Sequence, residues 1–377
     1  MPIRILLLAD THLGFDLPLR PRVWRRRRGE DFLANFHRAL EPARRGEVEL
    51  VVHGGDVFHR PRVPPSLVYQ GIEPLKEVAD SGIPVVIVPG NHERGRIPHP
   101  RFASHTNIHI FHRPRSFSLE VGGARVRLSG FPYHKRIRER FPELLAELGL
   151  QPPGGHHHAS GSDADISLLC IHHCVEGSRV QGHTFRGAPD VIRAQNIPDT
   201  VAAVLTGHIH RHQVLTQDLG GRRLNTPVFY PGSVERTAFA EWKESKGYLI
   251  LEVERGEAGS GGRVAGWRFR ELPARPMIQR ELRAEGLASV ALAGALDAIL
   301  AETPSDAVLR VRLLGRPAPD AFSVLSAANL RARSPSSMNL SVTLADEPRS
   351  GSGRGGKGSR LRRPHTAPDL QTELSLL

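Results

Sequence analysis

Residues 3–12 read Ile-Arg-Ile-Leu-Leu-Leu-Ala-Asp-Thr-His, a short apolar run that ends in a carboxylate and an imidazole. The β-branched and leucine-rich part predicts a buried strand, and Asp10 and His12 follow it directly. Because α/β folds place their chemistry in loops at the carboxyl ends of strands, this stretch predicts both a fold class and the position of a site. The run lacks a basic leader and a cleavage site, so we interpret it as a core strand and not as a signal peptide.

Four further motifs share this arrangement, since each follows an apolar run that predicts a strand. They are Gly55-Asp56, Gly90-Asn91-His92-Glu93, His172-His173 and Gly207-His208-Ile209-His210. With the first motif they supply two carboxylates, one amide oxygen and at least four imidazoles, the ligand inventory of a two-metal hydrolytic site. A single motif of this kind is also typical of a turn with a hydrogen-bonded histidine, but five of them would need five coincidences. The sequence therefore predicts a dinuclear-metal phosphoesterase, and this ligand set suits Mn²⁺, Fe²⁺ or Zn²⁺.

The first two-thirds of the chain alternates segments with strand and helix character. We predict strands near residues 3–8, 49–52, 83–88, 107–111, 116–121, 125–129, 166–171, 201–206, 223–230 and 248–253, and helices near 32–45 and 66–79. We expect Pro42 to end or kink the first of these helices. The β-α-β-α-β order at the start implies parallel strands, right-handed crossovers and a sheet that is buried on both faces. The sequence therefore predicts an α/β fold.

The composition changes at about Arg275, and we predict three regions. Residues 1–272 form the phosphoesterase domain, residues 275–347 form a small α+β domain, and residues 348–377 form a basic tail. The small domain is predicted from a helix at 287–301 and strands at 307–313 and 339–345, whereas the Gly/Ser-rich tail predicts disorder. The His156–His158 triplet lies in a Pro/Gly/Ser-rich stretch, so we interpret it as part of an exposed insertion and not as a metal site.

The charge balance favours polyanionic partners. The chain has 377 residues with 51 Lys+Arg against 39 Asp+Glu, a formal net charge of +12. The candidate DNA-binding residues are Arg25, Arg26, Arg27, Arg28, Arg60 and Arg62. The first four directly follow Trp24 in an arginine-rich run, and the last two follow the second motif. A run of like charge is typical of a solvated stretch as well as of phosphate binding, and both interpretations stay open at this point.

Cysteine usage and hydropathy indicate a cytoplasmic protein. The two cysteines, Cys170 and Cys174, are too few for a disulfide framework and fit a reducing compartment. No apolar stretch approaches the ~20 residues that a membrane-spanning helix needs. We therefore expect no contact with a membrane.

The order of the five motifs resembles that of the calcineurin-like metallophosphoesterase superfamily, over residues 1–254. Four flanking segments are similar to the SbcD-type DNA double-strand-break repair nucleases. They are Asp10-Thr11-His12-Leu13-Gly14, Gly54-Gly55-Asp56-Val57-Phe58-His59, Gly90-Asn91-His92-Glu93 and Tyr230-Pro231-Gly232-Ser233-Val234-Glu235-Arg236. The Arg275-Pro276-Met277 junction and the strand near 307–313 resemble that family's DNA-capping domain. This resemblance implies a β-sandwich of two mixed sheets flanked by helices, followed by the small α+β capping domain.

The resemblance also implies a role for individual residues around two divalent metal ions, with Mn²⁺ expected. The implied ligands are Asp10, His12, Asp56 and His210 for one metal, and Asp56, Asn91, His172 and His208 for the other. His92 matches the family's catalytic histidine, and His59 matches a histidine linked to exonuclease activity. His172 is preferred because it directly follows the run 168–171, while His173 stays an alternative.

The function implied by the resemblance is hydrolysis of DNA phosphodiester bonds, as an exonuclease and endonuclease in double-strand-break repair. The implied partners are DNA and an SbcC-type coiled-coil ATPase, and a homodimer is compatible with it. Two alternatives stay open. A metallophosphoesterase acting on nucleotides or phosphoproteins would not need His59, the arginines or a capping domain. A non-catalytic DNA-binding scaffold is disfavoured because every expected ligand is present.

Overall fold

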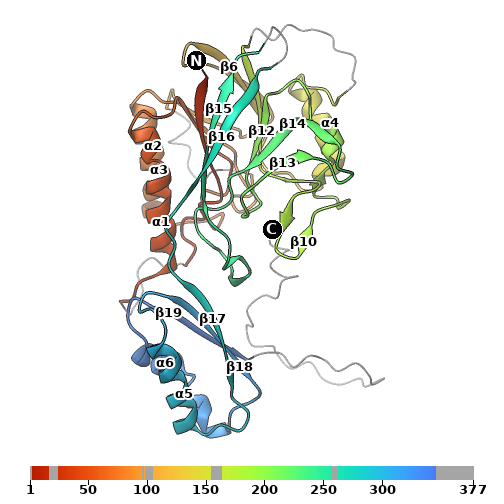
Figure 1. Cartoon of the computed structure of the whole chain (residues 1–377). Helices are drawn as coiled ribbons and strands as arrows, with labels where there is room; N and C mark the ends of the chain where they lie inside the picture. The colour runs from red at the N-terminus through yellow and green to blue at the C-terminus, as the bar shows by residue number, and fades with distance from the viewer. Residues whose placement is uncertain are drawn as a thin grey trace. The chain divides into compact units, whose positions relative to one another are not determined.

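The computed structural model describes residues 2–16, 24–95, 97, 105–153, 164–256 and 261–344. The chain divides into two compact units, drawn in Figure 1. Unit 1 comprises residues 1–20 and 28–274, and unit 2 comprises residues 21–27 and 275–377. The His156–His158 triplet and the basic tail at 348–377 lie outside the described residues, so their predicted disorder and exposure stay predictions.

The first sheet of unit 1 has the strand order β16-β15-β1-β2-β3-β4. Its strands are β1 (Ile3–Leu8), β2 (Leu50–His53), β3 (Val85–Ile87), β4 (Ile108–Ile110), β15 (Gly247–Glu254) and β16 (Arg263–Glu271). Strands β1 to β4 run parallel, as the β-α-β-α-β order predicts. Strands β15 and β16 add to the edge in antiparallel pairs, which makes the sheet mixed.

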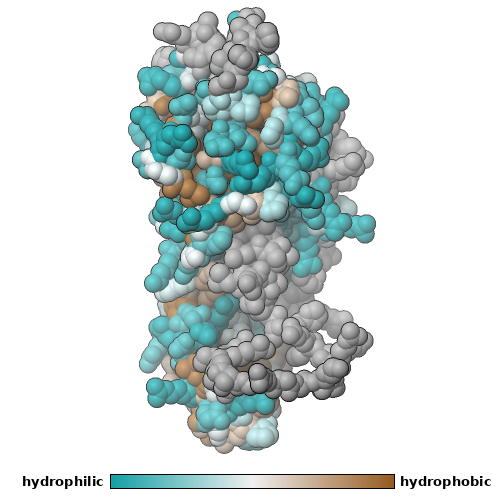
Figure 2. Space-filling view, turned by 90° about the vertical axis from the view of Figure 1, so that its right-hand side faces the viewer, coloured by the Kyte–Doolittle hydropathy of each residue, from teal (hydrophilic) through white to brown (hydrophobic). Residues whose placement is uncertain are grey.

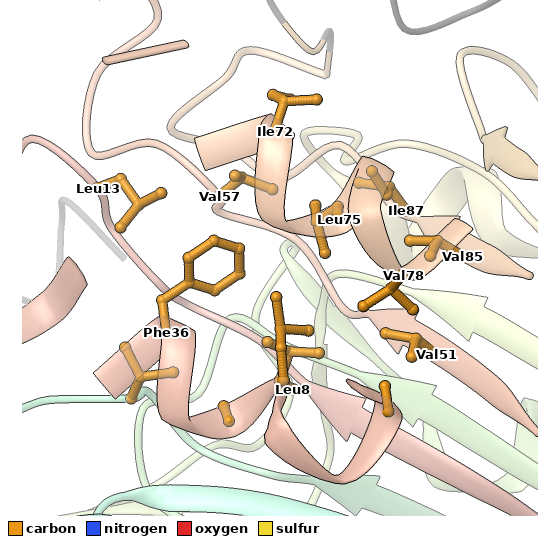
Figure 3. Packing of buried hydrophobic residues seen from close by; sticks show 14 of the residues in the cluster. Leu8, Leu13, Phe36, Val51, Val57, Ile72, Leu75, Val78, Val85 and Ile87 are labelled. Atoms are coloured by element: carbon orange, nitrogen blue, oxygen red, sulfur yellow. The ribbon is translucent and has the colours of Figure 1, made fainter. Parts of the chain in front are cut away.

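Side chains of this sheet alternate between two hydrophobic clusters, as the period of a strand requires. Leu8 and Val51 face α1 (Arg28–Ala39) and α3 (Pro65–Asp80), where Phe36 and Ile72 pack against them (Figure 3). Leu7 faces the second sheet instead, in a cluster with strand residues of both sheets. Helices therefore cover one face and a sheet covers the other.

The helix predicted at 32–45 is interrupted just before Pro42, where the sequence predicts an end or a kink. Helix α1 ends at Ala39, and a separate α2 (Glu41–Arg44) carries Pro42 in its first turn. Proline has no N–H to donate to the preceding turn, so it is tolerated at the start of a helix but not in its middle. The chain restarts the helix at the proline for this reason.

The second sheet of unit 1 has the strand order β13-β14-β12-β7-β6-β5. Its strands are β5 (Arg115–Val121), β6 (Ala124–Gly130), β7 (Ile166–Ile171), β12 (Ala203–Thr206), β13 (Gln213–Gln217) and β14 (Arg223–Tyr230). The inner strands β6, β7, β12 and β14 run parallel, and β5 and β13 pair antiparallel at the edges. The expected sandwich of two mixed sheets flanked by helices is confirmed.

Unit 1 also contains smaller elements, several of which cover the outer face of the second sheet. They are α4 (Ile137–Glu147), β8 (Cys174–Val175), β9 (Arg179–Val180), β10 (His183–Thr184), β11 (Val191–Ile192) and the 3₁₀ turns η2 (Ala194–Asn196) and η3 (Phe239–Glu241). Buried side chains of α4, including Phe141 and Leu144, pack in a cluster with Leu169 of β7 and Val204 of β12. Both cysteines are free and buried, Cys174 within this cluster and Cys170 within the cluster between the two sheets.

Unit 2 contains a three-stranded parallel sheet with the order β17-β18-β19. Its elements are β17 (Met277–Arg283), α5 (Ser289–Ala301), β18 (Val308–Leu314), η4 (Pro319–Ser323), α6 (Ala327–Arg333) and β19 (Asn339–Leu344). Leu292 and Leu296 of α5 pack with Leu309 and Val311 of β18 in a separate hydrophobic cluster. The unit therefore has its own core.

Where the surface in Figure 2 is coloured, hydrophilic side chains predominate, with small hydrophobic areas between them. Within the described ranges, no helix is both long enough and apolar enough to cross a membrane.

Candidate metal centre

The five motifs follow β1, β2, β3, β7 and β12, so they lie at the carboxyl ends of parallel strands. Backbone hydrogen bonds join the first two loops: Asp10 N donates to Gly55 O at 2.9 Å, and His12 N donates to Asp56 O at 3.0 Å. The two sheets are joined at the same place, because His208 N donates to both carboxylate oxygens of Asp10 at 3.1 Å. Motifs 198 residues apart in sequence thus form one cluster.

The backbone of these loops is strained at the candidate ligands. Among the described non-glycine residues, positive φ angles occur at Asp10 (51°), His12 (42°), Asp56 (54°), Arg94 (53°), Arg136 (54°) and His208 (81°). Such angles are uncommon for residues with a Cβ and cost on the order of 1–3 kcal/mol each. Four of these six positions are candidate metal ligands. The strain is concentrated where side chains must be aimed at one point, as is typical of functional sites.

The motif glycines are required by close backbone packing at this point. A Cβ on Gly90 would lie 2.1 Å from Asp56 Oδ1, and a Cβ on Gly207 would lie 2.6 Å from Gly54 O. Any side chain at these positions would push the loops apart. The glycines therefore allow the loops after β2, β3 and β12 to meet.

One group of side chains surrounds the amide of Asn91. Its Oδ1 lies 3.0 Å from His172 Nε2 and 2.9 Å from His208 Nδ1. His172 Nε2 also lies 3.3 Å from Asp56 Oδ2. These four residues are the set expected for the second metal.

A second group surrounds the imidazole of His12, which is fully buried. Its Nε2 lies 3.0 Å from Nε2 of His210, and Asp10 has a carboxylate oxygen within 4.8 Å of the ligand nitrogens of both. Asp10, Asp56 and His172 form a further set with ligand atoms within the same 4.8 Å, so the two groups are continuous. Buried carboxylates and imidazoles that face one another in this way fit divalent cations, because a cation satisfies several of them at once.

Burial and mutual charge determine the protonation of these groups. Burial lowers the pKa of His208 to about 3 and that of His12 well below its usual value. Burial also lowers the pKa of His172, but the carboxylates of Asp56 and Asp10 outweigh it and raise the pKa to about 9. His208 and His12 are therefore neutral and ready to bind a metal, whereas His172 must first release a proton.

The structure distinguishes His172 from His173, because the two rings point in different directions. His172 Nδ1 donates to Gly54 O at 2.7 Å, so its Nε2 faces Asp56. His173 turns the other way, with Nε2 3.1 Å from the carbonyl oxygen of His134 and its ring stacked on Tyr133 at 5.1 Å. The cluster thus contains His172 and not His173.

His92 and His59 lie beside the cluster. His92 N donates to Asp56 Oδ1 at 2.9 Å, and its Nδ1 donates to the carbonyl oxygen of His59 at 2.8 Å. The His59 ring lies beside both the His12 and the His92 rings, with centroid distances of 5.3 and 5.2 Å. Burial, with the charges of His92 and Arg60, lowers the pKa of His59 to about 4, so this ring is neutral at physiological pH.

A profile described as calcineurin-like phosphoesterase matches residues 3–212, more than half of the chain. The chain belongs to the calcineurin-like phosphoesterase family. Members of this family use a dinuclear metal centre, and the clusters described above are the candidate metal-binding groups of this phosphoesterase.

Curated relatives of this phosphoesterase include DNA repair proteins. The DNA double-strand break repair protein Mre11 of Methanopyrus kandleri is 24% identical over 273 residues, which is 67% of this chain and 55% of the relative. A subunit of the nuclease SbcCD of Bacillus subtilis is 26% identical over 276 residues, 68% of this chain and 67% of that protein. The chain thus spans about half the length of the archaeal relative. Among solved structures, a dimetal phosphatase from Danio rerio is 15% identical with a TM-score of 0.41, covering 70% of this chain and 99% of that one.

His53 supports the metal loops of the phosphoesterase, although the sequence analysis did not identify it. Its Nδ1 accepts from Gly55 N at 3.2 Å, and its Nε2 donates to Thr11 Oγ1 at 3.1 Å. Thr11 Oγ1 in turn donates to Val57 O. Burial lowers the pKa of His53 to about 3, which keeps it neutral in this role. Its only sequence signal is a polar residue inside an apolar strand.

Glu93 joins the loops after β2 and β3. Its Oε1 accepts from Phe58 N at 2.7 Å, and its Oε2 accepts from Gly90 N at 2.8 Å. Burial and the nearby Asp56 raise the pKa of Glu93 to about 8. Both carboxylate oxygens of Glu93 thus accept from backbone N–H groups and not from the ligand side chains.

The segment Tyr230–Arg236 surrounds the two histidine motifs of the second sheet. Tyr230 Oη donates to His173 O at 3.0 Å and accepts from Val175 N at 2.8 Å. A Cβ on Gly232 would lie 2.7 Å from His210 O. This segment therefore contacts the backbone of both histidine loops and helps to fix their positions.

The candidate DNA-binding arginines differ in their surroundings. Within unit 2, the guanidinium of Arg25 donates to backbone oxygens of Arg331, Ser334, Pro335 and Met338 near the end of α6. Within unit 1, Arg28 lies 3.8 Å from a carboxylate oxygen of Asp31 and 3.7 Å from one of Glu235. Arg26 and Arg27 are half-buried, whereas Arg60 and Arg62 are exposed. Contact of any of these arginines with DNA stays a prediction.

Proposed function

We propose that this phosphoesterase is a two-metal DNA nuclease that hydrolyses phosphodiester bonds in double-strand-break repair. The observation that carries the proposal is the convergence of seven oxygen and nitrogen ligands from the ends of five strands. The similarity to Mre11 and to a subunit of the nuclease SbcCD supports DNA as the substrate. The net charge of +12 favours the same polyanion.

We assign the ligands as two sets with a shared carboxylate. The assigned residues are Asp10, His12, Asp56 and His210 for one metal, and Asp56, Asn91, His172 and His208 for the other. Two bound divalent cations, which we expect to be Mn²⁺, supply Lewis acidity and lower the pKa of coordinated water. The protein side chains fix the positions of these ligands in advance, which limits reorganisation during the reaction.

We assign His92 as the catalytic histidine. Because Nδ1 of His92 donates to the His59 carbonyl, its Nε2 is the nitrogen available to a phosphate oxygen, and it lies 3.8 Å from Asp56 Oδ2. A histidine in this position can stabilise the developing charge or protonate the leaving oxygen. His59 would act through its carbonyl and through its ring contact with His12, by orienting both neighbours.

We further propose Arg60 and Arg62 as phosphate contacts, because they are exposed and directly follow His59. The run Arg25–Arg28 would contribute through its charge, although Arg25 and Arg28 already bond within the protein. The proposed partners are DNA and an SbcC-type coiled-coil ATPase, with a homodimer as a further assembly. A cytoplasmic location follows from the proposed function and from the two free cysteines.

The test is digestion of linear duplex DNA by the purified chain with Mn²⁺, alongside an EDTA control and the Asp56→Ala variant. Cleavage that depends on Mn²⁺ and on Asp56 supports the proposal. Activity on small phosphodiesters alone would instead indicate a phosphoesterase of nucleotides or phosphoproteins. DNA binding without cleavage would indicate a non-catalytic scaffold.

A further inference from the structure

We propose that Glu241 is a positioning residue for His210, and that the buried Lys246 holds Glu241 in place. The carboxylate would fix the imidazole so that its Nε2 points into the metal centre. This inference rests on the proposed function, because it takes His210 as a metal ligand.

The ring of His210 is bound through its outer nitrogen. His210 Nδ1 donates to Glu241 Oε1 at 3.0 Å and lies 3.0 Å from Thr237 Oγ1. Thr237 Oγ1 donates to the same carboxylate oxygen at 2.7 Å. With the proton held on Nδ1, Nε2 keeps its lone pair, and this nitrogen lies 3.0 Å from His12 Nε2. A carboxylate on the outer nitrogen of a ligand histidine fixes its tautomer and orientation and increases its basicity as a ligand.

Lys246 connects this carboxylate to the backbone of the same histidine. Its side chain is 1% exposed, and its Nζ contacts Glu241 Oε2 at 2.7 Å, Glu244 Oε2 at 3.0 Å and His210 O at 2.8 Å. An ammonium has three N–H donors, and each has an acceptor here. A buried charge is stable only when it is paired in this way. The ammonium of Lys246 therefore fixes both the carboxylate of Glu241 and the backbone carbonyl of His210.

The rest of the loop leaves little freedom to His210 except rotation of its ring. Ser233 N donates to His210 O at 3.1 Å, and Gly232 packs against the same carbonyl. Thr237 N donates to Glu241 Oε2 at 3.1 Å, which sets the carboxylate at the end of η3. With the backbone fixed, the bond from Nδ1 to Glu241 determines the direction of Nε2.

Substitution of Glu241 tests the inference, with Glu244 as the matched control. Both carboxylates bind Lys246, but Glu244 has no bond to the His210 ring among those described. In the chain freed of metal, Glu241→Gln should weaken Mn²⁺ binding about 10–100-fold in titration calorimetry, the usual effect of losing such a partner. Glu244→Gln should bind Mn²⁺ like the wild type. The visible spectrum of bound Co²⁺, which reports ligand geometry, should change in Glu241→Gln only.

A double-mutant cycle separates positioning from a general structural role. If Glu241 acts through His210, Glu241→Gln should cause no further loss of Mn²⁺ affinity in a His210→Ala background. Additive losses would overturn the inference, as would equal affinities and spectra for Glu241→Gln and Glu244→Gln. Thermal unfolding in EDTA monitors folding. If Glu241→Gln does not fold, Glu241→Asp replaces it, since this variant keeps the charge beside Lys246 but withdraws it from the ring.

These outcomes are distinct from failure of the proposed function. A wild-type chain that binds Mn²⁺ with this dependence on Glu241 but does not cleave DNA contradicts the nuclease proposal only. A wild-type chain that binds no Mn²⁺ overturns both.

Discussion

The two halves of the candidate metal centre hold their histidines by different means. On one side, His172 donates to the backbone carbonyl of Gly54, which is fixed by the loop after β2. On the other side, His210 donates to the carboxylate of Glu241, which is fixed by a buried lysine. A carbonyl provides a neutral, rigid acceptor, whereas a carboxylate adds negative charge and makes the imidazole a stronger ligand. One half therefore depends on backbone packing and the other on side-chain charge.

The largest effect is expected where the two halves meet. Asp56→Ala removes the carboxylate that we assign to both ligand sets and that lies 3.3 Å from His172 Nε2. We expect loss of detectable turnover on DNA and loss of stoichiometric Mn²⁺, measured by a nuclease assay and by elemental analysis. Retention of two Mn²⁺ per chain would show that Asp56 is not shared.

His92→Asn should separate chemistry from metal binding. Loss of a general acid or of charge stabilisation reduces turnover by about 10²–10⁴-fold, while the ligands of both halves stay in place. We expect wild-type Mn²⁺ content by elemental analysis together with this loss of activity. Loss of metal in the variant would contradict the role that we assign to His92.

Gly90→Ala should affect the half that depends on backbone packing. A Cβ at this position would lie 2.1 Å from Asp56 Oδ1 and 2.6 Å from Asp56 N, so the loops must separate. Overpacking of this kind costs about 1–3 kcal/mol in the free energy of unfolding. We expect this loss in urea denaturation without metal, and weaker Mn²⁺ binding. Wild-type stability and affinity would show that the loops can move apart without cost.

The pH dependence of stability should distinguish the histidines with lowered pKa values from His172, whose pKa is raised. The pKa values of His53 and His208 are about 3 in the folded chain and that of His59 is about 4, below the ordinary 6.5. Their contribution to the free energy of unfolding is present above pH 6.5 and is lost as the pH falls through 4 toward 3. The pKa of His172 is about 9, so its contribution is present below pH 6.5 and is lost as the pH rises toward 9.

The metal-free chain should therefore have its highest melting temperature near pH 6.5. If His172 is a ligand, Mn²⁺ should reduce the loss of stability on the alkaline side, because a metal binds an imidazole in its deprotonated form. Melting curves from pH 4 to 9.5, with EDTA and with Mn²⁺, measure both effects. An alkaline loss that is equal with and without Mn²⁺ would contradict the assignment of His172 as a ligand.

The smallest effects concern the arginines. Arg60→Ala and Arg62→Ala should each reduce the slope of log binding constant against log salt by about 0.9 if each contacts one phosphate of duplex DNA. Arg25→Ala should lower the stability of unit 2 and change the slope little, because its guanidinium bonds to backbone oxygens there. The opposite pattern would assign phosphate binding to Arg25.

The sequence predicted the parts of the site that depend on local pattern. The apolar runs of β1, β2, β3, β7 and β12 end at the motifs, so both the strands and the convergence of their loops could be predicted. The strand β16 was not predicted, since it is an edge strand whose residues are exposed or only partly buried and include no apolar run. Helix α4 was also missed, because Pro142 interrupts its pattern.

The partners of the ligands could not be predicted, since the fold creates them. The contact of His53 with Thr11 crosses 42 residues, and that of His210 with Glu241 crosses 31. The acceptors of Arg25 lie more than 300 residues away in the sequence. The local sequence around Arg25 therefore cannot distinguish it from a solvated basic segment. His172 and His173 follow the same strand, and only the direction of each ring distinguishes them.

Anomalous diffraction from crystals of the chain soaked in Mn²⁺ tests the central claim most directly. We predict two peaks, one bound by Asp10, His12, Asp56 and His210, and the other bound by Asp56, Asn91, His172 and His208. A single peak, no peak, or a peak bound by His173 in place of His172 would contradict the account.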